Sequence, residues 1–303
     1  MSIAPSEVPL QEPRSGPDAF RLESIRRRQW KVFWSSPLAY MGVGLLGFII
    51  AFCFLGPLVW HASLYNTNVT LQVHGPMRGH PLGTDSLGRD ELIRLMVGGQ
   101  VSLIVGFVSA VASMVLGTLY GMVSPVIGGW VDVVLMRIID VLNSIPTLFL
   151  LLLLDSMFTP NPTLLTIIIA ATSWPGVTRL VRSEVLSVRQ REYIEAANAM
   201  GASTWSIMIR HLLPNVMGVV LVTTTFQVGN AILTIAGLSF LGLGLPPPLP
   251  NWGQMLNEGM NYIFQNAWWM IYPAGLAIVF VELAVNFIGD AFRQAFDPRL
   301  LGA

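Results

Sequence analysis

Few side chains in this sequence could do chemistry, and their spacing fits none of the common catalytic arrangements. The four histidines are His61, His74, His80 and His211, and no two have the spacing of a zinc-protease helix. No Gly-x-Ser-x-Gly segment supplies a serine nucleophile. His74 and His80 precede Asp85 and could ligate a metal, but lone loop histidines are more often simply solvated. We therefore expect no hydrolase, no metal site and no cofactor.

The single lysine argues against a nucleotide site. A P-loop needs a lysine directly after glycine, because that side chain reaches the terminal phosphates. Lys31 instead follows Gln29 and Trp30. The chain is predicted to lack an ATPase site of its own and not to be an enzyme. A net charge of zero gives no basic field for nucleic acid.

Polar residues inside long apolar runs are a second group of candidates. Glu282 lies near the middle of such a run, where a charged side chain costs roughly 2.5–3.5 kcal/mol on insertion scales, so it should face a pore or a partner helix. Asn286 follows one turn later on the same face. Gln227 and Asn230 could line a polar passage or bond to neighbouring helices. These four residues are the predicted pore-lining candidates.

The elements that must position these residues are membrane helices. Hydrophobic residues make up 53% of the 303 positions and charged residues 11%, against roughly 25% charged in an average soluble domain. No charge lies within 38–60, 101–123 or 212–257, and a helix needs about 20 apolar residues to cross the hydrocarbon. We predict an all-α integral membrane fold with six transmembrane helices. These are Leu38–Trp60, Val101–Val123, Val133–Leu154, Thr163–Arg182, Val216–Leu238 and Trp268–Ile288.

Basic residues set the predicted orientation. Six spans put both termini on one side, and if that side is cytosolic, 14 of the 17 Lys and Arg face the cytosol, all except Arg78, Arg89 and Arg94. Four tryptophans, Trp252 among them, lie near the predicted outer boundaries, where indole rings favour the headgroup layer. We expect a multi-pass inner-membrane protein. Its parts are a cytosolic tail (1–36), the first span with an outer segment (37–100), a core of five spans (101–290) containing an inner connection (183–215), and a cytosolic C-terminal tail (291–303).

The inner connection, residues 183–215, is where a soluble partner would dock. Glu192–Met200 is rich in helix-forming residues, and Gly201 can close this helix in a left-handed conformation. Ser203 is the predicted N-cap of a second helix, which Pro214 is expected to stop before the next span. A helix lying on the membrane surface without any partner is the alternative interpretation.

The same connection resembles the EAA loop of ABC importer permeases, whose pattern is Glu-Ala-Ala, three residues, Gly, then a distant Leu-Pro. Two alanines leave almost no side chain at the tip, so that a groove on another protein could close around the backbone. The resemblance implies a coupling helix seated in a cleft of an ATPase subunit. The matching residues are Glu195, Ala196, Ala197, Gly201, Leu213 and Pro214.

Further blocks extend this resemblance along nearly the whole chain and are similar to the dipeptide and oligopeptide branch of the family. They are His211–Asn215, LGTDSLGRDELIRL, GGWVDVVLMRIIDVL, LSFLGLGLPPPLPNWGQML and NFIGDAFRQAFDPRL. The resemblance implies a type I permease core in a lipid bilayer, with a homologous second permease, two cytosolic ATP-binding subunits and an extracytoplasmic solute-binding protein as partners. The implied cargo is a short peptide, with nickel or another small solute as the alternative.

Glu282 departs from the resemblance, because the family usually has an apolar residue at that position. An ion-gradient-driven secondary transporter, with Glu282 as the coupling group, is therefore kept as a hypothesis from a different class.

The outer block, Leu82–Leu95, carries charges at helical spacing. Asp85 with Arg89 and Asp90 with Arg94 are i, i+4 pairs. They could stabilise a ledge and nothing more, because exposed pairs add little energy. The alternative is that Asp85, Arg89 and Asp90 dock the solute-binding protein.

Two other patterns concern packing. Small residues recur at every fourth position across Ser109–Gly121, which lets another helix approach closely, and we favour packing within the chain over a seam between subunits. Arg137 and Asp140 lie one turn apart and are predicted to pair with each other.

Overall fold

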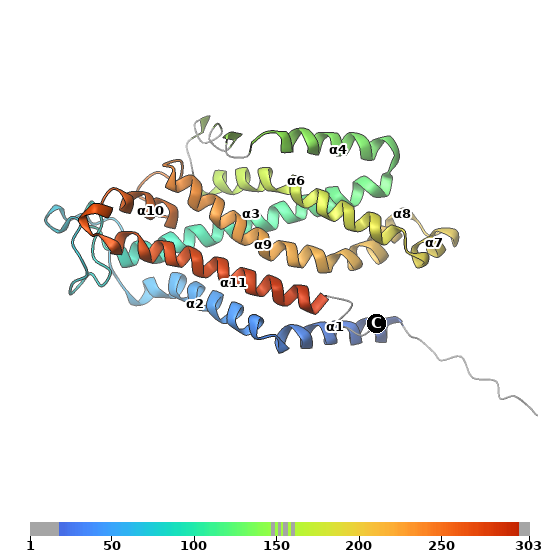
Figure 1. Ribbon diagram of the computed structural model, residues 1–303, viewed down its shortest axis with the longest axis horizontal. Coiled ribbons are helices and arrows are strands. Elements are labelled where there is room, and N and C mark those ends of the chain that lie inside the picture. Colours follow the sequence, from blue (N-terminus) through green and yellow to red (C-terminus); the bar gives the residue numbers. More distant parts are fainter. Residues whose placement is uncertain (1–17, 147–148, 151–152, 154–156, 159–160, 297–303) are drawn as a thin grey trace, which may run out of the picture.

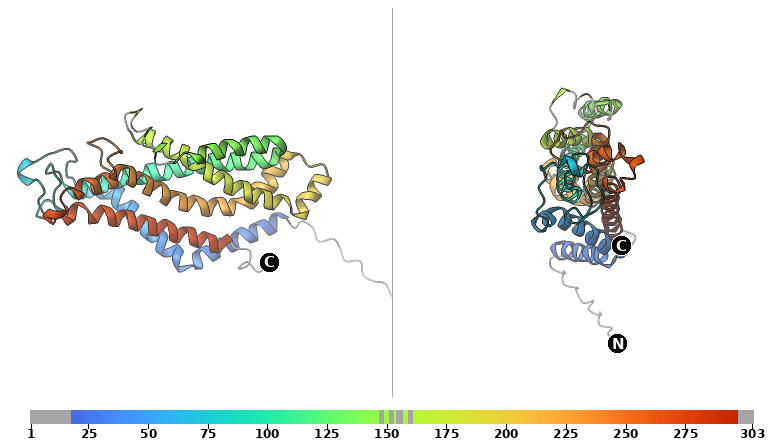
Figure 2. Two further views of the ribbon diagram at one scale, coloured as in Figure 1. Left: turned by 45° about the horizontal axis from the view of Figure 1, so that its top comes forward. Right: turned by 90° about the vertical axis from the view of Figure 1, so that its left-hand side faces the viewer.

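Long helices lying side by side make up the part of the chain that the computed structural model describes, with no strand among those residues (Figure 1; Figure 2). The described residues are 18–146, 149–150, 153, 157–158 and 161–296. The longer helices are α1 (Asp18–Ser35), α2 (Pro37–Val59), α3 (Glu91–Ile127), α4 (Gly129–Ser144), α6 (Pro162–Arg189), α7 (Glu192–Ala199), α9 (Leu213–Phe240), α10 (Trp252–Met260) and α11 (Tyr272–Phe296). The short ones are η1 (Val69–Leu71), α8 (Thr204–Ile207), η2 (Met208–Leu212), η3 (Ile263–Gln265) and η4 (Trp268–Met270).

Five stretches of the described residues are long and apolar enough to cross a membrane. They correspond to the first, second, fourth, fifth and sixth predicted spans, and the all-helical membrane fold is confirmed. Helix α4 accounts for the beginning of the third. Half of the rest of that span, half of the turn after it, and parts of both predicted tails lie outside the described residues. The five stretches are Pro37–Val59, Glu91–Ile127, Pro162–Arg189, Thr204–Phe240 and Trp268–Phe296.

The helices extend beyond the bilayer-length limits that hydropathy indicated. Helix α3 begins at Glu91, well before the predicted Val101, because the Asp90 carboxylate caps it by accepting a hydrogen bond from the Ile93 amide at 2.9 Å. Helix α6 continues to Arg189. Hydropathy marks the part of a helix that lies in hydrocarbon, whereas the cap decides where the helix itself begins.

The outward faces of the helices stay apolar. Phe48 on α2 is 67% exposed, and Leu116 on α3 and Phe280 on α11 are also exposed. Side chains of this kind at high exposure fit hydrocarbon or another subunit, not water. The interior is correspondingly formed by the inward stripes of five helices.

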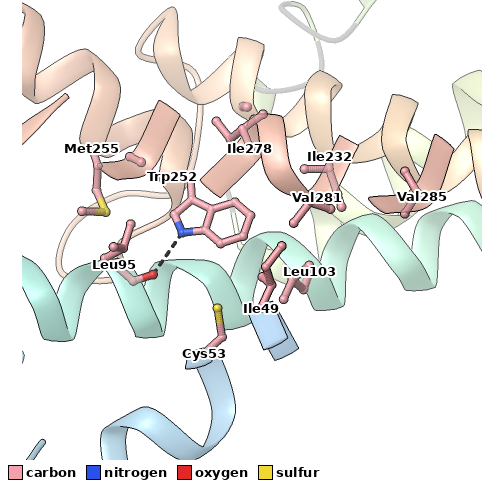
Figure 3. Close-up of a cluster of buried hydrophobic side chains, with 12 residues drawn as sticks. Ile49, Cys53, Leu95, Leu103, Ile232, Trp252, Met255, Ile278, Val281 and Val285 are labelled. Atoms are coloured by element: carbon pink, nitrogen blue, oxygen red, sulfur yellow. Dashed lines mark hydrogen bonds between the residues drawn. The ribbon is translucent and has the colours of Figure 1, made fainter. Parts of the chain in front are cut away.

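Trp252 of α10 lies in that interior, not in the headgroup layer that its position in the sequence indicates. It is 1% exposed, and its indole N–H donates to the Leu95 carbonyl of α3 at 3.0 Å (Figure 3). Gly99 makes room for the ring, because a Cβ there would lie 2.7 Å from it. Cys53 of α2 borders the same cluster. The prediction for this tryptophan is wrong because the helix of α10 folds back over α3.

The small residues of α3 pack within the chain. A Cβ on Gly117 would lie 2.6 Å from the Cβ of Val177 on α6, and one on Gly121 would lie 2.7 Å from the Thr178 carbonyl. This confirms the interpretation of that half of the stripe as an internal contact, and it lets α3 and α6 approach closely.

The bundle has two different ends. Helices α7 and α8 lie at one end, and α10 lies with the segment before α3 at the other (Figure 1). We call these the α7 end and the α10 end. Helix α1 and the last turns of α11 lie towards the α7 end, where the rings of Phe33 and Phe292 stack with centroids 4.6 Å apart.

Candidate functional site

Helix α7 forms the tip of the connection between two spanning helices and is held by few buried side chains. Ile194 points into an apolar cluster that includes Val185 of α6 and Leu212 of η2. Ala197, one turn later, is also buried. The predicted helix over Glu192–Met200 is observed one residue shorter, as Glu192–Ala199. Its anchorage is therefore apolar and comes from one face only.

The end of α7 has the hydrogen bonds of a Schellman motif. Gly201 has a φ of +81°, its amide donates to the Asn198 carbonyl at 3.0 Å, and the Ala202 amide donates to the Ala197 carbonyl at 3.1 Å. Glycine suits this left-handed position because it has no Cβ to clash. The left-handed conformation predicted for Gly201 is confirmed.

The remaining face of α7 is open. Glu195 and Ala196 are exposed, and Met200 beyond the helix is 83% exposed. Of the two alanines, therefore, Ala196 is presented to the surroundings while Ala197 packs inward. Such a tip offers backbone and small side chains to a partner, and one carboxylate beside them.

Pro214 does not stop the helix as predicted. Ser203 caps α8, with its Oγ accepting from the Ser206 amide at 3.3 Å, and from Thr204 one helix of 37 residues runs to Phe240. The five residues of η2 before Leu213 are a π-turn. Proline has no amide hydrogen, and this wider turn lets the helix pass it without a break. Leu213 is partly buried against the apolar cluster and Pro214 is exposed.

Two contacts tie the base of this connection to neighbouring helices. Arg182 of α6 donates to the Asp132 carboxylate of α4 through Nε at 2.8 Å and Nη2 at 2.5 Å. The Arg189 guanidinium donates to the Pro125 carbonyl of α3. These two contacts join α6, which directly precedes α7, to both α3 and α4.

At the α10 end, the predicted pair of Asp85 with Arg89 is confirmed, but the pair is buried, not exposed, and it belongs to a larger network. The Asp85 carboxylate accepts from Arg89 Nε at 2.6 Å and also from Arg94. Arg94 Nη2 donates to Glu258 of α10 at 2.7 Å, and Arg94 is 2% exposed. The predicted pair of Asp90 with Arg94 is wrong, because Asp90 caps α3 and Arg94 bonds to Asp85 and Glu258 instead.

Asp90 has three other partners. Its Oδ1 accepts hydrogen bonds from the Ile93 amide, as the cap of α3, and from the Trp60 indole N–H at 3.3 Å. Its Oδ2 lies 2.8 Å from His80 Nδ1. Asp85, Arg89 and Asp90 are all buried. They hold the segment before α3 against α10 and offer no side chain to a docking partner.

The pore candidates fall on two neighbouring helices. Glu282 and Asn286 of α11 are half-buried, with Asn286 Nδ2 donating to Glu282 Oε1 at 3.3 Å. Glu282 lies against Gly229 of α9, where a Cβ would come within 2.9 Å of its Cδ atom. On α9, Gln227 is half-buried and Asn230 exposed. The structure thus brings Glu282 and Asn286 together beside α9.

Arg137 and Asp140 do not pair as predicted. Asp140 instead accepts from Arg179 of α6 at 2.6 Å. The spacing of one turn on α4 is present, but an arginine on the neighbouring helix α6 bonds to the carboxylate instead.

Sequence reasoning missed Glu258 as a partner of the outer charges. Glu258 is the first charged residue after the uncharged stretch 212–257. A single acid directly after so long an uncharged stretch was the feature of the sequence that could have indicated a partner. Its partner Arg94 is 164 residues away in the chain, so no local spacing rule relates the two.

The fold defines a polytopic helical membrane protein that presents a small helix, α7, between two of its spans. Its sequence matches the family described as the binding-protein-dependent transport system inner membrane component over residues 113–302, and the chain belongs to this family. Residues 24–76 match the N-terminal TM domain of oligopeptide transport permease C. The protein is accordingly a multi-pass inner-membrane permease of an ABC transporter.

Named relatives cover most of the chain. It is 35% identical over 291 residues to the dipeptide transport system permease protein DppC of Alkalihalophilus pseudofirmus, spanning 95% of each chain. It is 37% identical over 269 residues to the oligopeptide transport system permease protein OppC of Haemophilus influenzae, spanning 88% of this chain and 86% of the relative. A putative peptide permease protein of Brucella suis is 43% identical over 226 residues, 74% of each.

Proposed function

We propose that this permease moves short peptides into the cytosol, driven by ATP hydrolysis in partner subunits. The chain forms half of a translocation pore with a homologous second permease. Two cytosolic ATP-binding subunits and an extracytoplasmic solute-binding protein complete the assembly. The chain itself has no ATPase site and makes or breaks no covalent bond. Peptide cargo is favoured by the names of the relatives, which are dipeptide, oligopeptide and peptide permeases; the nickel alternative has no comparable support.

One observation carries this proposal: α7 is an exposed tip on an apolar base. Glu195, Ala196 and the Gly201 turn are accessible, whereas Ile194 and Ala197 fix the helix to the bundle. A cleft on an ATP-binding subunit can enclose such a tip and push on it. Closure of the ATP-binding subunits would then rock the helices and open the pore alternately to each side.

The proposed orientation places α7 and both termini in the cytosol. It is supported by the excess of Lys and Arg on that side, 14 of 17, as the positive-inside rule requires. Helix α1 also lies towards the α7 end of the bundle (Figure 1).

At the opposite end, Asp85, Arg89 and Asp90 would act in docking as positioning residues. They are buried, and they fix the segment before α3 on which the solute-binding protein would rest.

A charge reversal combined with a bulky side chain at the tip tests the proposal. In the complete transporter reconstituted in proteoliposomes, Glu195→Arg with Ala196→Trp should abolish ATP-dependent peptide uptake and capture of the ATP-binding subunits. Both side chains are exposed, so insertion and folding of the permease should be unchanged. The control is Ser35→Trp, an exposed position on α1.

Unchanged uptake and capture in the double variant would refute the coupling role of α7. Uptake that persists after removal of the ATP-binding subunits, and that Glu282→Gln abolishes, would instead support the ion-gradient hypothesis.

A further inference from the structure

Glu282 is an acid in a spanning helix that has no basic partner. None of the ion pairs formed among the described residues includes it. The nearest arginine further along α11, Arg293, is eleven residues on, which corresponds to about 16 Å of helix. That arginine lies over the ring of Phe226, 5.7 Å from its centroid. Among the described residues, therefore, none supplies a positive charge to the Glu282 carboxyl group.

The carboxylate is also only half satisfied by hydrogen bonds. Oε1 accepts from Asn286 Nδ2 at 3.3 Å, whereas Oε2 is buried and has no hydrogen-bond partner among the described residues. A buried carboxylate oxygen without a donor is unfavourable, and the usual remedy is a cation or a strong donor from elsewhere.

The residue that faces the Glu282 carboxyl group is a glycine, which leaves space for it. Gly229 of α9 lies directly opposite, where a Cβ would come within 2.9 Å of Oε1 and Cδ. Any other residue at 229 would displace the acid from the seam between α9 and α11. Asn230 next to it is exposed and Gln227 is half-buried, so the same stretch of α9 carries two amides at the margin of the seam.

We propose that Glu282, where α9 and α11 meet, recognises the α-ammonium group of the cargo peptide as it passes through the pore that this chain forms with the second permease. The inference rests on the proposed peptide import and names the feature of the peptide that this permease selects. A free α-amino group is a cation with three donors, which complements a carboxylate that lacks both a counter-charge and a donor.

This recognition depends on the conformational state. Oε2 is occluded in the present arrangement, and the carboxylate gains a partner only in a state of the transporter in which the packing of α9 on α11 leaves this oxygen accessible from the pore. A ligand that interacts differently with two states shifts the balance between them, which is what alternating access requires.

The test compares tri-alanine with N-acetyl-tri-alanine, which lacks the cation but keeps the peptide. Uptake of both is measured in proteoliposomes containing the complete transporter, for wild type, Glu282→Gln and Glu282→Asp. The control is Asp290→Asn, which removes one negative charge from the same helix two turns further on. Normalising each variant to wild type cancels any preference exerted by the solute-binding protein.

We expect the ratio of free to acetylated peptide uptake to fall about tenfold in Glu282→Gln, as for loss of one charge-assisted hydrogen bond. It should be largely kept in Glu282→Asp and unchanged in Asp290→Asn. An unchanged ratio in Glu282→Gln, or equal loss of both peptides, overturns this inference and leaves ATP-driven import standing.

If Glu282→Gln does not assemble, the uptake of the two peptides by the wild-type transporter still tests the inference. Equal uptake of tri-alanine and N-acetyl-tri-alanine by wild type overturns it. A wild-type transporter that takes up no peptide with ATP would instead overturn the proposed function, and this inference with it.

Discussion

The two ends of the bundle are held by different forces. At the α7 end, Ile194 and Ala197 anchor the tip through apolar contacts. At the α10 end, Asp85, Arg94 and Glu258 form a buried chain of ionic hydrogen bonds. Apolar contacts are non-directional and tolerate sliding, whereas charge-assisted hydrogen bonds fix distance and angle. The comparison indicates one end suited to being pushed and one suited to staying rigid.

Removing Arg94 should have the largest effect on stability, because it takes away one of the two arginine partners of the buried Asp85 carboxylate and the nearer arginine partner of Glu258. Arg94→Met is expected to lower the free energy of unfolding by about 3–5 kcal/mol. Denaturant unfolding of the purified protein in mild detergent measures it. The matched change towards the other end is Arg182→Met, whose partner Asp132 is partly exposed, and about 1 kcal/mol is expected there. An equal loss in both variants would mean that the two ends do not differ in this way.

The two alanines of α7 should respond differently to the same enlargement. Ala197 is buried, so Ala197→Leu overpacks the apolar cluster and should cost about 1–3 kcal/mol of stability. Ala196 is exposed, so Ala196→Leu should change stability by less than about 0.5 kcal/mol while weakening capture of the ATP-binding subunits. Unfolding and capture are measured on both variants. A stability loss confined to Ala196→Leu would contradict the observed orientation of α7.

Replacing the glycine in the turn after α7 should have the smallest effect on stability. A Cβ at Gly201 would meet no atom within 4 Å, so Gly201→Ala isolates the cost of the left-handed φ, about 1–2 kcal/mol. Gly176 in α6 is equally unobstructed but helical, and Gly176→Ala should be neutral or stabilise by up to about 1 kcal/mol. Unfolding measurements that gave the two changes the same sign would refute the role assigned to the turn after α7.

Features set by neighbouring residues were predictable from the sequence. The spans follow from uncharged runs, and the left-handed Gly201 and the Ser203 cap depend on residues within one turn. The tip of the candidate site is local in the same sense, since Glu195 and Ala196 lie within one short helix.

The predictions that are wrong depend on contacts between distant parts of the chain or on an irregular turn. The spacing of Asp90 and Arg94 indicates a pair, but Glu258 on another helix offers Arg94 a buried partner instead. Pro214 is a helix breaker by its own chemistry, yet the preceding π-turn accommodates it. Trp252 is not found at the headgroups because hydropathy contains no information on how α10 folds back.

The helix from Thr204 to Phe240 is unbroken over 37 residues, so it is about 55 Å long. A stiff rod of this length pivoting near its middle by about 5° displaces each tip by roughly 2 Å in opposite directions. Its irregular turn, Met208–Leu212, lies next to α7, the proposed contact with the ATP-binding subunits. If a partner displaces one end of this helix, the other end would therefore move in the opposite direction. The pore would then narrow on one side of the membrane while it widens on the other.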